Sequence, residues 1–337
     1  MGIHVISICA ILAIIPLYWL PVLPDLQTVW MLIAAGIALS LQQRKWLTFS
    51  GLALLFLCWG ILAAQESVWP MNHLTKAPQQ AEVVITATDG ATMHQGRIVS
   101  LNGKRVWAAM GVALYGNYLP QNVCVGQRWA TTLRLRAVHG ELNDGGYDSQ
   151  KNAFARHQTL SGRFTHAEIV DAHCSLRAQY LTSLQNTLSA YQWGTVILGL
   201  GMGERLSVSR EIKNLMRETG TMHLMAISGL HIALAASVIW FLARGIQFFL
   251  PGRWIIWQIP LLAGLIFAAF YAWLTGLQPP ALRTVIALVV LAALKMSGRQ
   301  WSPWQVWLTC VAAILIFDPL AVLSQSLALS AFAVAAL

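Results

Sequence analysis

The sequence predicts a polytopic α-helical membrane protein of about eight spans, with an exported small β-barrel of OB-like type inserted between them. Of its 337 residues, 57% are hydrophobic and only 10% are charged, whereas soluble chains carry about 25% charged residues. Several apolar runs also approach the roughly 20 residues that a helix needs to cross a bilayer. This composition excludes a soluble enzyme and a disordered chain.

Eight apolar segments account for the predicted spans. They cover residues 3–21, 26–41, 47–64, 222–243, 254–275, 281–297, 303–318 and 320–337. The first segment lacks the basic start and the A-x-A-like cleavage site of a signal peptide, so we treat it as a retained span. We therefore expect three spans in residues 1–65, the exported barrel in 66–175, an amphipathic, interfacial helical segment in 176–220 and further spans in 221–337.

Positive charges in the short loops predict the orientation of these spans. If the amino terminus is cytoplasmic, the alternation of spans places six cations on the cytoplasmic side: Arg44, Lys45, Arg244, Arg253, Lys295 and Arg299. The opposite short loops carry Asp25 and Asp318. The inverse orientation would export all six cations, so we expect residues 66–219 to lie outside the cytoplasm.

Alternating and β-branched residues predict five strands in the exported part, over 81–89, 96–101, 104–113, 128–138 and 161–170. Asn102 and Gly103 separate two of these strands and form a strong two-residue hairpin signal. A five-stranded module of this length fits an OB-like barrel, although other small barrels share the same periodicity. From Leu176 onward, the apolar residues change to helical spacing.

Residues 66–219 carry 15 Lys+Arg against 11 Asp+Glu, which is +4 of the chain's net charge of +9. Cations and aromatic rings are the ingredients of a groove for single-stranded nucleic acid, because cations follow phosphates and rings stack on bases. The candidate DNA-binding residues are Arg97, Arg105, Trp107, Arg134 and Arg136. Trp129 shares its face with Leu133 and fits the barrel core better. The arginines could equally form a solvated surface or face lipid headgroups.

The five cysteines divide by compartment. Cys9, Cys58 and Cys310 lie in predicted spans and are read as small buried residues. Cys124 and Cys174 lie in the exported part, where an oxidising compartment would allow a disulfide between them. The histidines are scattered and no His/Cys cluster occurs, so we expect neither a metal nor another cofactor.

The most distinctive stretch covers residues 199–231, GLGMGERLSVSREIKNLMRETGTMHLMAISGLH. It resembles the ComEC family of DNA-uptake channel proteins. Further matches follow in order: residues 143–148 (NDGGYD), 274–283 (LTGLQPPALR), 317–319 (FDP) and the segment 327–332. Asp144 departs from the pattern, since the family commonly has Pro there. The resemblance covers nearly the whole chain.

The resemblance implies a channel in the bacterial inner membrane that passes single-stranded DNA into the cytoplasm during natural transformation. It implies partners as well: single-stranded DNA, the lipid bilayer, the DNA-receptor and motor proteins of an uptake machinery, and a possible homodimer. Family members usually continue into a metallo-β-lactamase-like domain, which would lie beyond residue 337. We therefore expect the chain to be truncated before that domain, and we expect no enzymatic activity in residues 1–337.

Four residues near the start of the fourth span are candidates for lining or shaping the pore: His223, Ser228, Gly229 and His231. Ser228 and His231 are three residues apart and would share one helical face. The structural alternative is hydrogen bonding between helices, with Gly229 allowing close approach. A Ser/His nucleophile is a further reading, but no acidic partner and no nucleophile elbow is recognisable.

Arg283 is the residue that most needs a partner, because a charge within a span is unfavourable by about 2.5–3.5 kcal/mol on the insertion scale. It could snorkel to the outer interface, pair with Asp318, or contact a translocating phosphate. Pro279 suits the start of its helix, whose first-turn N–H groups would also favour anions.

Two other functions remain open. A small-molecule or lipid-precursor transporter would show internal repeats with paired broken helices, and no such symmetry is visible in the two blocks of spans. An intramembrane Ser/His hydrolase would lose its function with Ser228→Ala alone and would be covalently labelled at Ser228.

Overall fold

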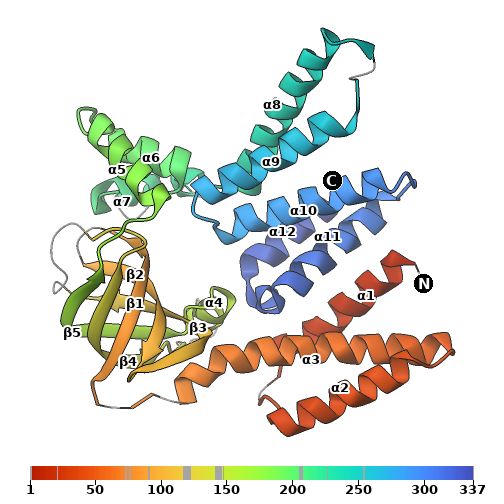
Figure 1. Ribbon diagram of the computed structural model, residues 1–337, viewed down its shortest axis with the longest axis horizontal. Helices are drawn as coiled ribbons and strands as arrows, with labels where there is room; N and C mark the ends of the chain where they lie inside the picture. Colours follow the sequence, from red (N-terminus) through yellow and green to blue (C-terminus); the bar gives the residue numbers. More distant parts are fainter. Residues whose placement is uncertain are drawn as a thin grey trace.

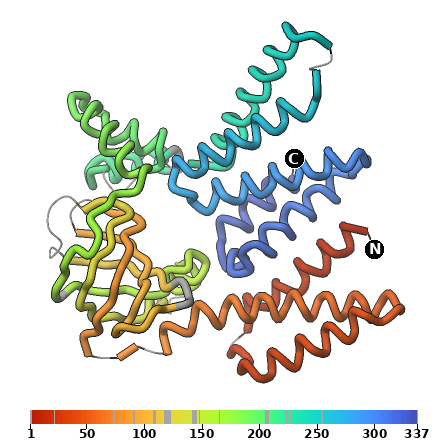
Figure 2. The backbone as a smooth tube through the Cα atoms, viewed as in Figure 1, coloured from red at the N-terminus to blue at the C-terminus, as the bar shows by residue number. Residues whose placement is uncertain are grey.

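The computed structural model describes residues 2–20, 22–72, 74–75, 77–89, 92–116, 123–140, 146, 148–204, 208–225, 227–252 and 255–336. A β-barrel lies at one end of a group of apolar helices, and a cluster of short helices lies beside the barrel (Figure 1). Figure 2 shows that both chain termini lie on the helical side of the molecule.

Three helices precede the barrel. They are α1 (Ile3–Ile14), which continues as the 3-10 turn η1 (Ile15–Tyr18), α2 (Leu26–Ser40) and α3 (Lys45–Asn72). Helices α2 and α3 approach closely at two glycines, since a Cβ on Gly51 would lie 2.6 Å from the carbonyl oxygen of Gly36. Apolar side chains such as Ile14, Val29 and Ile61 pack these helices together and against α11 (Pro303–Phe317).

Helix α3 corrects the predicted domain boundary at residue 65. The predicted boundary falls where polar residues begin, but the helix runs on to Asn72. Glu66 is exposed, and the Gln65 amide donates to the carbonyl oxygen of Pro24, so neither polar group interrupts the helix. Pro70 lies in the last turn, where its missing N–H removes one helical hydrogen bond and the helix ends two residues later. The barrel therefore begins only at Gln79.

The barrel has five strands, which confirms the predicted small β-barrel. They are β1 (Gln79–Thr88), β2 (Met93–Leu101), β3 (Lys104–Tyr115), β4 (Arg128–Ala137) and β5 (Leu160–Asp171). The strands close in the order β1-β2-β3-β5-β4, and β3 and β5 form the one parallel pair among them. A short helix, α4 (Ser149–Ala155), precedes β5.

The barrel interior follows the alternation in the sequence. Trp129, Leu133 and Phe164 are each at most 1% exposed and belong to one apolar cluster. Trp129 is thus a core residue, and its indole N–H donates to the side-chain oxygen of Gln127. Asn102 and Gly103 both have positive φ, at 49° and 76°, as a tight hairpin turn requires.

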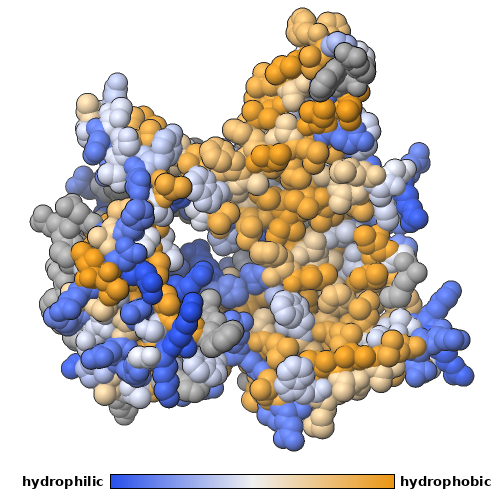
Figure 3. Space-filling model, in the orientation of Figure 1, coloured by the Kyte–Doolittle hydropathy of each residue, from blue (hydrophilic) through white to orange (hydrophobic). Residues whose placement is uncertain are grey.

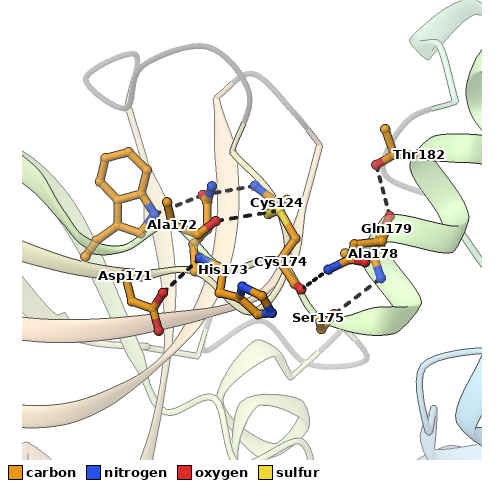
Figure 4. The surroundings of a disulfide bond; sticks show 11 residues. Cys124, Asp171, Ala172, His173, Cys174, Ser175, Ala178, Gln179 and Thr182 are labelled. Atoms are coloured by element: carbon orange, nitrogen blue, oxygen red, sulfur yellow. Dashed lines mark hydrogen bonds between the residues drawn. A yellow bond between two sulfur atoms is a disulfide. The ribbon is translucent and has the colours of Figure 1, made fainter.

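A disulfide joins Cys124 to Cys174 at the exit of the barrel (Figure 4). The Cα atoms are 5.7 Å apart, within the usual range for a disulfide. The Ser175 N–H donates to the carbonyl oxygen of Val125 (2.8 Å), and the Ser175 hydroxyl caps the next helix at the Ala178 N–H. The bridge therefore fixes both the end of β5 and the start of that helix.

The predicted interfacial segment forms three short helices, α5 (Leu176–Leu188), α6 (Gly194–Met202) and α7 (Arg210–Glu218). Exposed apolar residues mark α6 and the turn before it, among them Tyr191, Trp193 and Ile197. Trp and Tyr are enriched at membrane interfaces, where one edge of the ring is apolar and the other is hydrated.

The last part of the chain contains η2 (Thr221–Met225), α8 (Gly229–Phe248), α9 (Gln258–Leu274), α10 (Pro279–Met296), α11, η4 (Pro319–Leu323) and α12 (Gln325–Ala335). Two predicted spans begin later than expected. His223 lies in η2 and not in the helix, because α8 starts only at Gly229. The apolar run from 320 breaks at Ser324, which has the extended backbone of an N-cap.

Three described helices are long and apolar enough to cross a membrane: α3, α8 and α10. The other five predicted spans correspond to apolar helical segments that are shorter. The connections α2–α3, α8–α9 and α10–α11 lie at the helix ends away from the barrel (Figure 1). Figure 3 shows a broad hydrophobic surface over the helices and a mainly hydrophilic surface on much of the barrel. This is the polarity of a membrane protein.

Replacing both bridged cysteines by serine (Cys124→Ser with Cys174→Ser) should destabilise the barrel. The bridge spans 50 residues, and the loop-closure model then allows a loss of up to about 4 kcal/mol. Hydrogen exchange followed by mass spectrometry should show faster exchange in β4 and β5. Cys9→Ser removes a thiol outside the bridge and should change nothing there. Unchanged protection in the double variant would show that the bridge contributes no stability.

Candidate functional site

A cavity of about 530 Å³ lies between the barrel and the helices. Its walls come from α3, from β2 and the residues after α4, and from α10, α11 and η4. Four residues that the sequence singled out line it together: Arg97, Pro279, Arg283 and Asp318. The structure therefore places one residue predicted for DNA binding on the barrel beside three predicted for the spans.

Two further basic residues of the cavity were not singled out from the sequence. Arg156 and His157 follow α4 and reach the cavity from the barrel side. His157 has a φ of 53°, a left-handed conformation that turns the chain out of the helix. No periodic pattern marks these two positions, so only the tertiary structure shows that they face the helices.

Arg283 lies in the second turn of α10 and directs its guanidinium into the cavity wall. Nε donates to the carbonyl oxygen of Pro279 (3.1 Å) and one Nη donates to the hydroxyl of Ser326 (2.8 Å). The other Nη is shielded from solvent and has no hydrogen-bond partner among the described residues. The predicted ion pair with Asp318 does not form within 4.0 Å there. One Nη of Arg283 can therefore still donate hydrogen bonds.

Asp318 instead connects the helices to the barrel. Its Oδ1 lies 3.2 Å from Nε2 of His157 and accepts from the Leu320 N–H at 3.1 Å. The hydrogen bond to Asp318 raises the pKa of His157 above 6.5, its partial burial opposes this, and the charges of Asp318 and Glu66 add to the increase. This contact therefore contributes fully below about pH 6.5 and is lost as the pH rises through the elevated pKa of His157.

The start of α10 offers fewer donors to an anion than expected. Pro279 and Pro280 have no N–H, and the Leu282 N–H already donates to the carbonyl oxygen of Gln278 (3.0 Å). Only the N–H of Ala281 remains in this first turn. The sequence expectation of an anion site made by free backbone N–H groups is corrected accordingly, so positive charge near this helix end comes mainly from side chains.

Ser228 and His231 form a local pair at the start of α8. Nδ1 of His231 lies 2.8 Å from Oγ of Ser228 and accepts from the Ser228 N–H at 3.3 Å. This is a capping arrangement in which histidine takes the place of the usual Glu or Gln. Ser228 is the N-cap and His231 the third helical residue, so the contact between the two side chains caps the helix.

Gly229 allows α8 to approach α10 closely. A Cβ at this position would clash with the hydroxyl of Thr284, the neighbour of Arg283 in sequence. The Ser-Gly-Leu-His motif therefore helps to set the position of the helix that carries Arg283. The side chains of His223 and Trp107 lie outside the described residues, so their predicted roles stay predictions.

Arg177, which the sequence reasoning missed, joins two of the motifs. From the first turn of α5, its Nε donates to the carbonyl oxygen of Leu274 (2.7 Å) and an Nη donates to that of Met202 (3.2 Å). These are end carbonyls of α9 and α6, where helix dipoles favour a cation. Burial lowers the pKa of Arg177, and the carboxylate of Glu204, 4.0 Å away, opposes this. The only sequence signal was a cation next to a predicted disulfide.

Four exposed residues form a row across three adjacent strands on the outside of the barrel, which we call the barrel stripe: Tyr115, Arg163, Arg134 and Arg136. Tyr115 on β3 is in register with Arg163 on β5, and Arg163 is in register with Arg134 on β4. Arg136 lies two residues further along β4. Arg163 was missed as a candidate, although its alternation with buried Phe164 marks it as outward-facing.

The barrel stripe is positively charged without compensation. Arg134 and Arg163 face each other directly, an arrangement that costs free energy in a sheet. Neither forms an ion pair within 4.0 Å among the described residues. Arg105 lies apart, at the β2–β3 hairpin opposite Ser100, and Arg97 faces the cavity. The predicted arginines therefore occupy three separate places.

No group of three potential metal ligands occurs among the described residues. His231 bonds only Ser228 there, so no carboxylate orients its ring.

Gly229→Ala should lower the melting temperature of the purified protein, because the added methyl group displaces Thr284 and overpacks the α8–α10 contact by about 1–3 kcal/mol. Gly245→Ala in the same helix is the matched control, since its Cβ would enter open space. Adding Thr284→Ala to Gly229→Ala should restore part of the loss. Equal melting temperatures for Gly229→Ala and Gly245→Ala would contradict the proposed close approach.

Comparisons with known proteins agree with these motifs. Residues 200–337 match the family model described as competence protein. The chain is 58% identical to the uncharacterized protein YcaI of Escherichia coli over 100% of its own length and 45% of that protein. It is 35% identical to recombination protein 2 of Haemophilus influenzae over 62% of this chain and 26% of that protein.

The chain is also 31% identical to competence protein ComA of Neisseria gonorrhoeae, over 82% of this chain and 41% of that protein. It thus spans less than half the length of each of these relatives. No solved structure matches it. Because the competence model, the named relatives and the small β-barrel coincide with the motifs above, the chain belongs to the ComEC family of competence proteins.

Proposed function

We propose that this chain is an inner-membrane channel component through which single-stranded DNA enters the cytoplasm during natural transformation. Membership of the competence family supports a role in DNA uptake. The structural observation that carries the proposal is the barrel stripe. Its three guanidinium groups can follow phosphates and its exposed tyrosine ring can stack on a base, which are the two requirements for binding a single strand without sequence preference.

All eight apolar segments cross the membrane in this proposal, with the amino terminus in the cytoplasm and residues 66–219 in the periplasm. The loop cations support this orientation, because Arg44, Lys45 and Arg299 lie at the helix ends away from the barrel. The disulfide supports an oxidising compartment for the barrel. The barrel then meets DNA on the outside, and α8–α12 provide the route inward.

A strand cannot cross hydrocarbon unaided, because each nucleotide carries one phosphate charge and lipid offers no counter-charge. The route must therefore be lined by protein polar groups. The competence motifs supply such groups near the barrel end of the helices, where Ser228, His231 and Arg283 lie. We infer that these residues shape or line the entrance, and that motor proteins of the uptake machinery are partners of the chain.

The alternatives have weaker support. The Ser228–His231 hydrogen bond is the one observation that favours an intramembrane hydrolase, but among the described residues no third group orients His231. We therefore propose that residues 1–337 carry no enzymatic activity and need no cofactor. A small-molecule transporter gives the barrel stripe no role. A DNA-receptor protein, the bilayer and a second copy of the chain are the remaining proposed partners.

Replacing Arg134 and Arg163 by alanine should weaken binding of oligothymidylate to the purified chain. Because each phosphate contact on a single strand contributes about 0.7 to the slope of log K against log salt, the double variant should lower that slope by about 1.4. Tyr115→Ala should cost about 1–3 kcal/mol of binding free energy at every salt concentration. Fluorescence anisotropy in a salt titration measures both effects.

Arg299→Ala is the matched control, since it removes an arginine from the α10–α11 connection and should leave affinity and slope unchanged. If the stripe variants bind with the affinity and salt slope of the unmodified chain, the barrel stripe is only a solvated surface. The proposed function would then lose its structural support.

A further inference from the structure

We propose that the cavity between the barrel and the helices is a second site for the strand, which binds one phosphodiester group through Arg283. The proposal rests on the proposed function, because it takes the ligand to be single-stranded DNA. It adds a defined position where the exported barrel and the spans hold the same nucleotide.

The first support is the unused hydrogen-bonding capacity of Arg283. A guanidinium group has five N–H donors in a planar fork that matches a phosphate. Pro279 and Ser326 accept from two of its nitrogens, while the remaining Nη is buried without a described partner. Such a donor is costly to leave unpaired, so an acceptor that arrives in the cavity gains a strong, charge-assisted bond.

The second support is that the nearby carboxylate is engaged elsewhere. Asp318 is held by His157 and by the Leu320 N–H, and it does not reach Arg283 within 4.0 Å. The other acidic residue of the cavity, Glu66, is exposed to solvent on α3. An incoming phosphate therefore has to displace no carboxylate from the guanidinium group of Arg283.

The third support is the number of cations that face the same space. Arg97 approaches from β2 and Arg156 from the end of α4, and both are exposed in their present positions. Neither forms an ion pair among the described residues. Arg97 and Arg156 from the barrel side and Arg283 from α10 therefore place three guanidinium groups around the cavity, against two carboxylates. This excess of positive charge favours an anionic ligand.

The size and walls of the cavity suit a nucleotide of a strand. Its volume of about 530 Å³ falls within the range of roughly 300–1,000 Å³ that is usual for ligand sites. Leu282, Ile286 and Ile314 provide apolar wall beside the arginines. These side chains can contact a sugar or a base while the guanidinium groups hold the phosphate.

A position-specific cross-link tests the proposal in the full chain. Leu282→p-benzoylphenylalanine places a photoreactive group in the cavity wall. The protein is reconstituted in nanodiscs of phosphatidylcholine and irradiated with labelled oligothymidylate. We expect a cross-link whose yield falls about tenfold with Arg283→Gln, the effect of losing one charged hydrogen bond. Arg299→Gln should leave the yield unchanged.

Arg97→Gln and Arg156→Gln keep the test decisive if Arg283→Gln does not fold, because both residues are exposed and each should reduce the yield. The proposal is overturned if no cross-link forms, or if none of the three arginine substitutions changes the yield of the cross-link. Nanodiscs that contain phosphatidylglycerol form a second arm. If this lipid cross-links at position 282 and displaces the oligonucleotide, the cavity holds a lipid headgroup and the proposal is wrong.

The result is distinguishable from a failure of the proposed function. Salt-dependent binding at the barrel stripe without a cavity cross-link removes only the second site. Loss of both removes the DNA-binding role of the barrel as well.

Discussion

The barrel is attached to the helices through the segment before β1 and through the segment after β5. The positions of the residues that line the cavity depend on this attachment. Helix α3 leads into β1 after only a short connection. After β5, the Cys124–Cys174 bridge, the Ser175 cap and the Arg177 guanidinium follow one another within four residues. Arg177 bonds the end of α9, and α10 begins after one short turn. The disulfide therefore lies close in the chain to Arg177, which contacts the helix end just before the turn that leads into α10 and Arg283.

This attachment explains why the charged groups gather where the barrel and the helices meet. Hydrocarbon excludes unpaired charge, so an arginine in a span has to lie near a helix end and find polar partners. Arg283 does so at the cavity, beside Arg97 and Arg156 from the barrel side. The His157–Asp318 contact links the same two parts and weakens with rising pH. A strand that binds the barrel would thus meet the spans at a place where cations already converge.

The sequence predicted the strands and the apolar helices well, but it did not predict which residues of the barrel and of the helices contact one another. Alternation located the five strands and the buried Trp129, because the period of a strand depends only on which side chains face the core. The predicted bounds of α3 and α8 were wrong. Hydropathy alone does not indicate that α3 continues through the polar Glu66, or that a cap at Ser228 sets the start of α8. The cavity could not be predicted, because Arg97 and Arg283 lie far apart in sequence and only tertiary packing brings them together.

The most direct measurement is a structure of the chain in a nanodisc with bound oligothymidylate, determined by electron cryomicroscopy. If one strand contacts the barrel and the helices together, its density should run along Tyr115, Arg163 and Arg134, with a phosphate against Arg283. Strand density confined to another face of the barrel, or a barrel detached from α10 and α11 when DNA is bound, would contradict this shared contact.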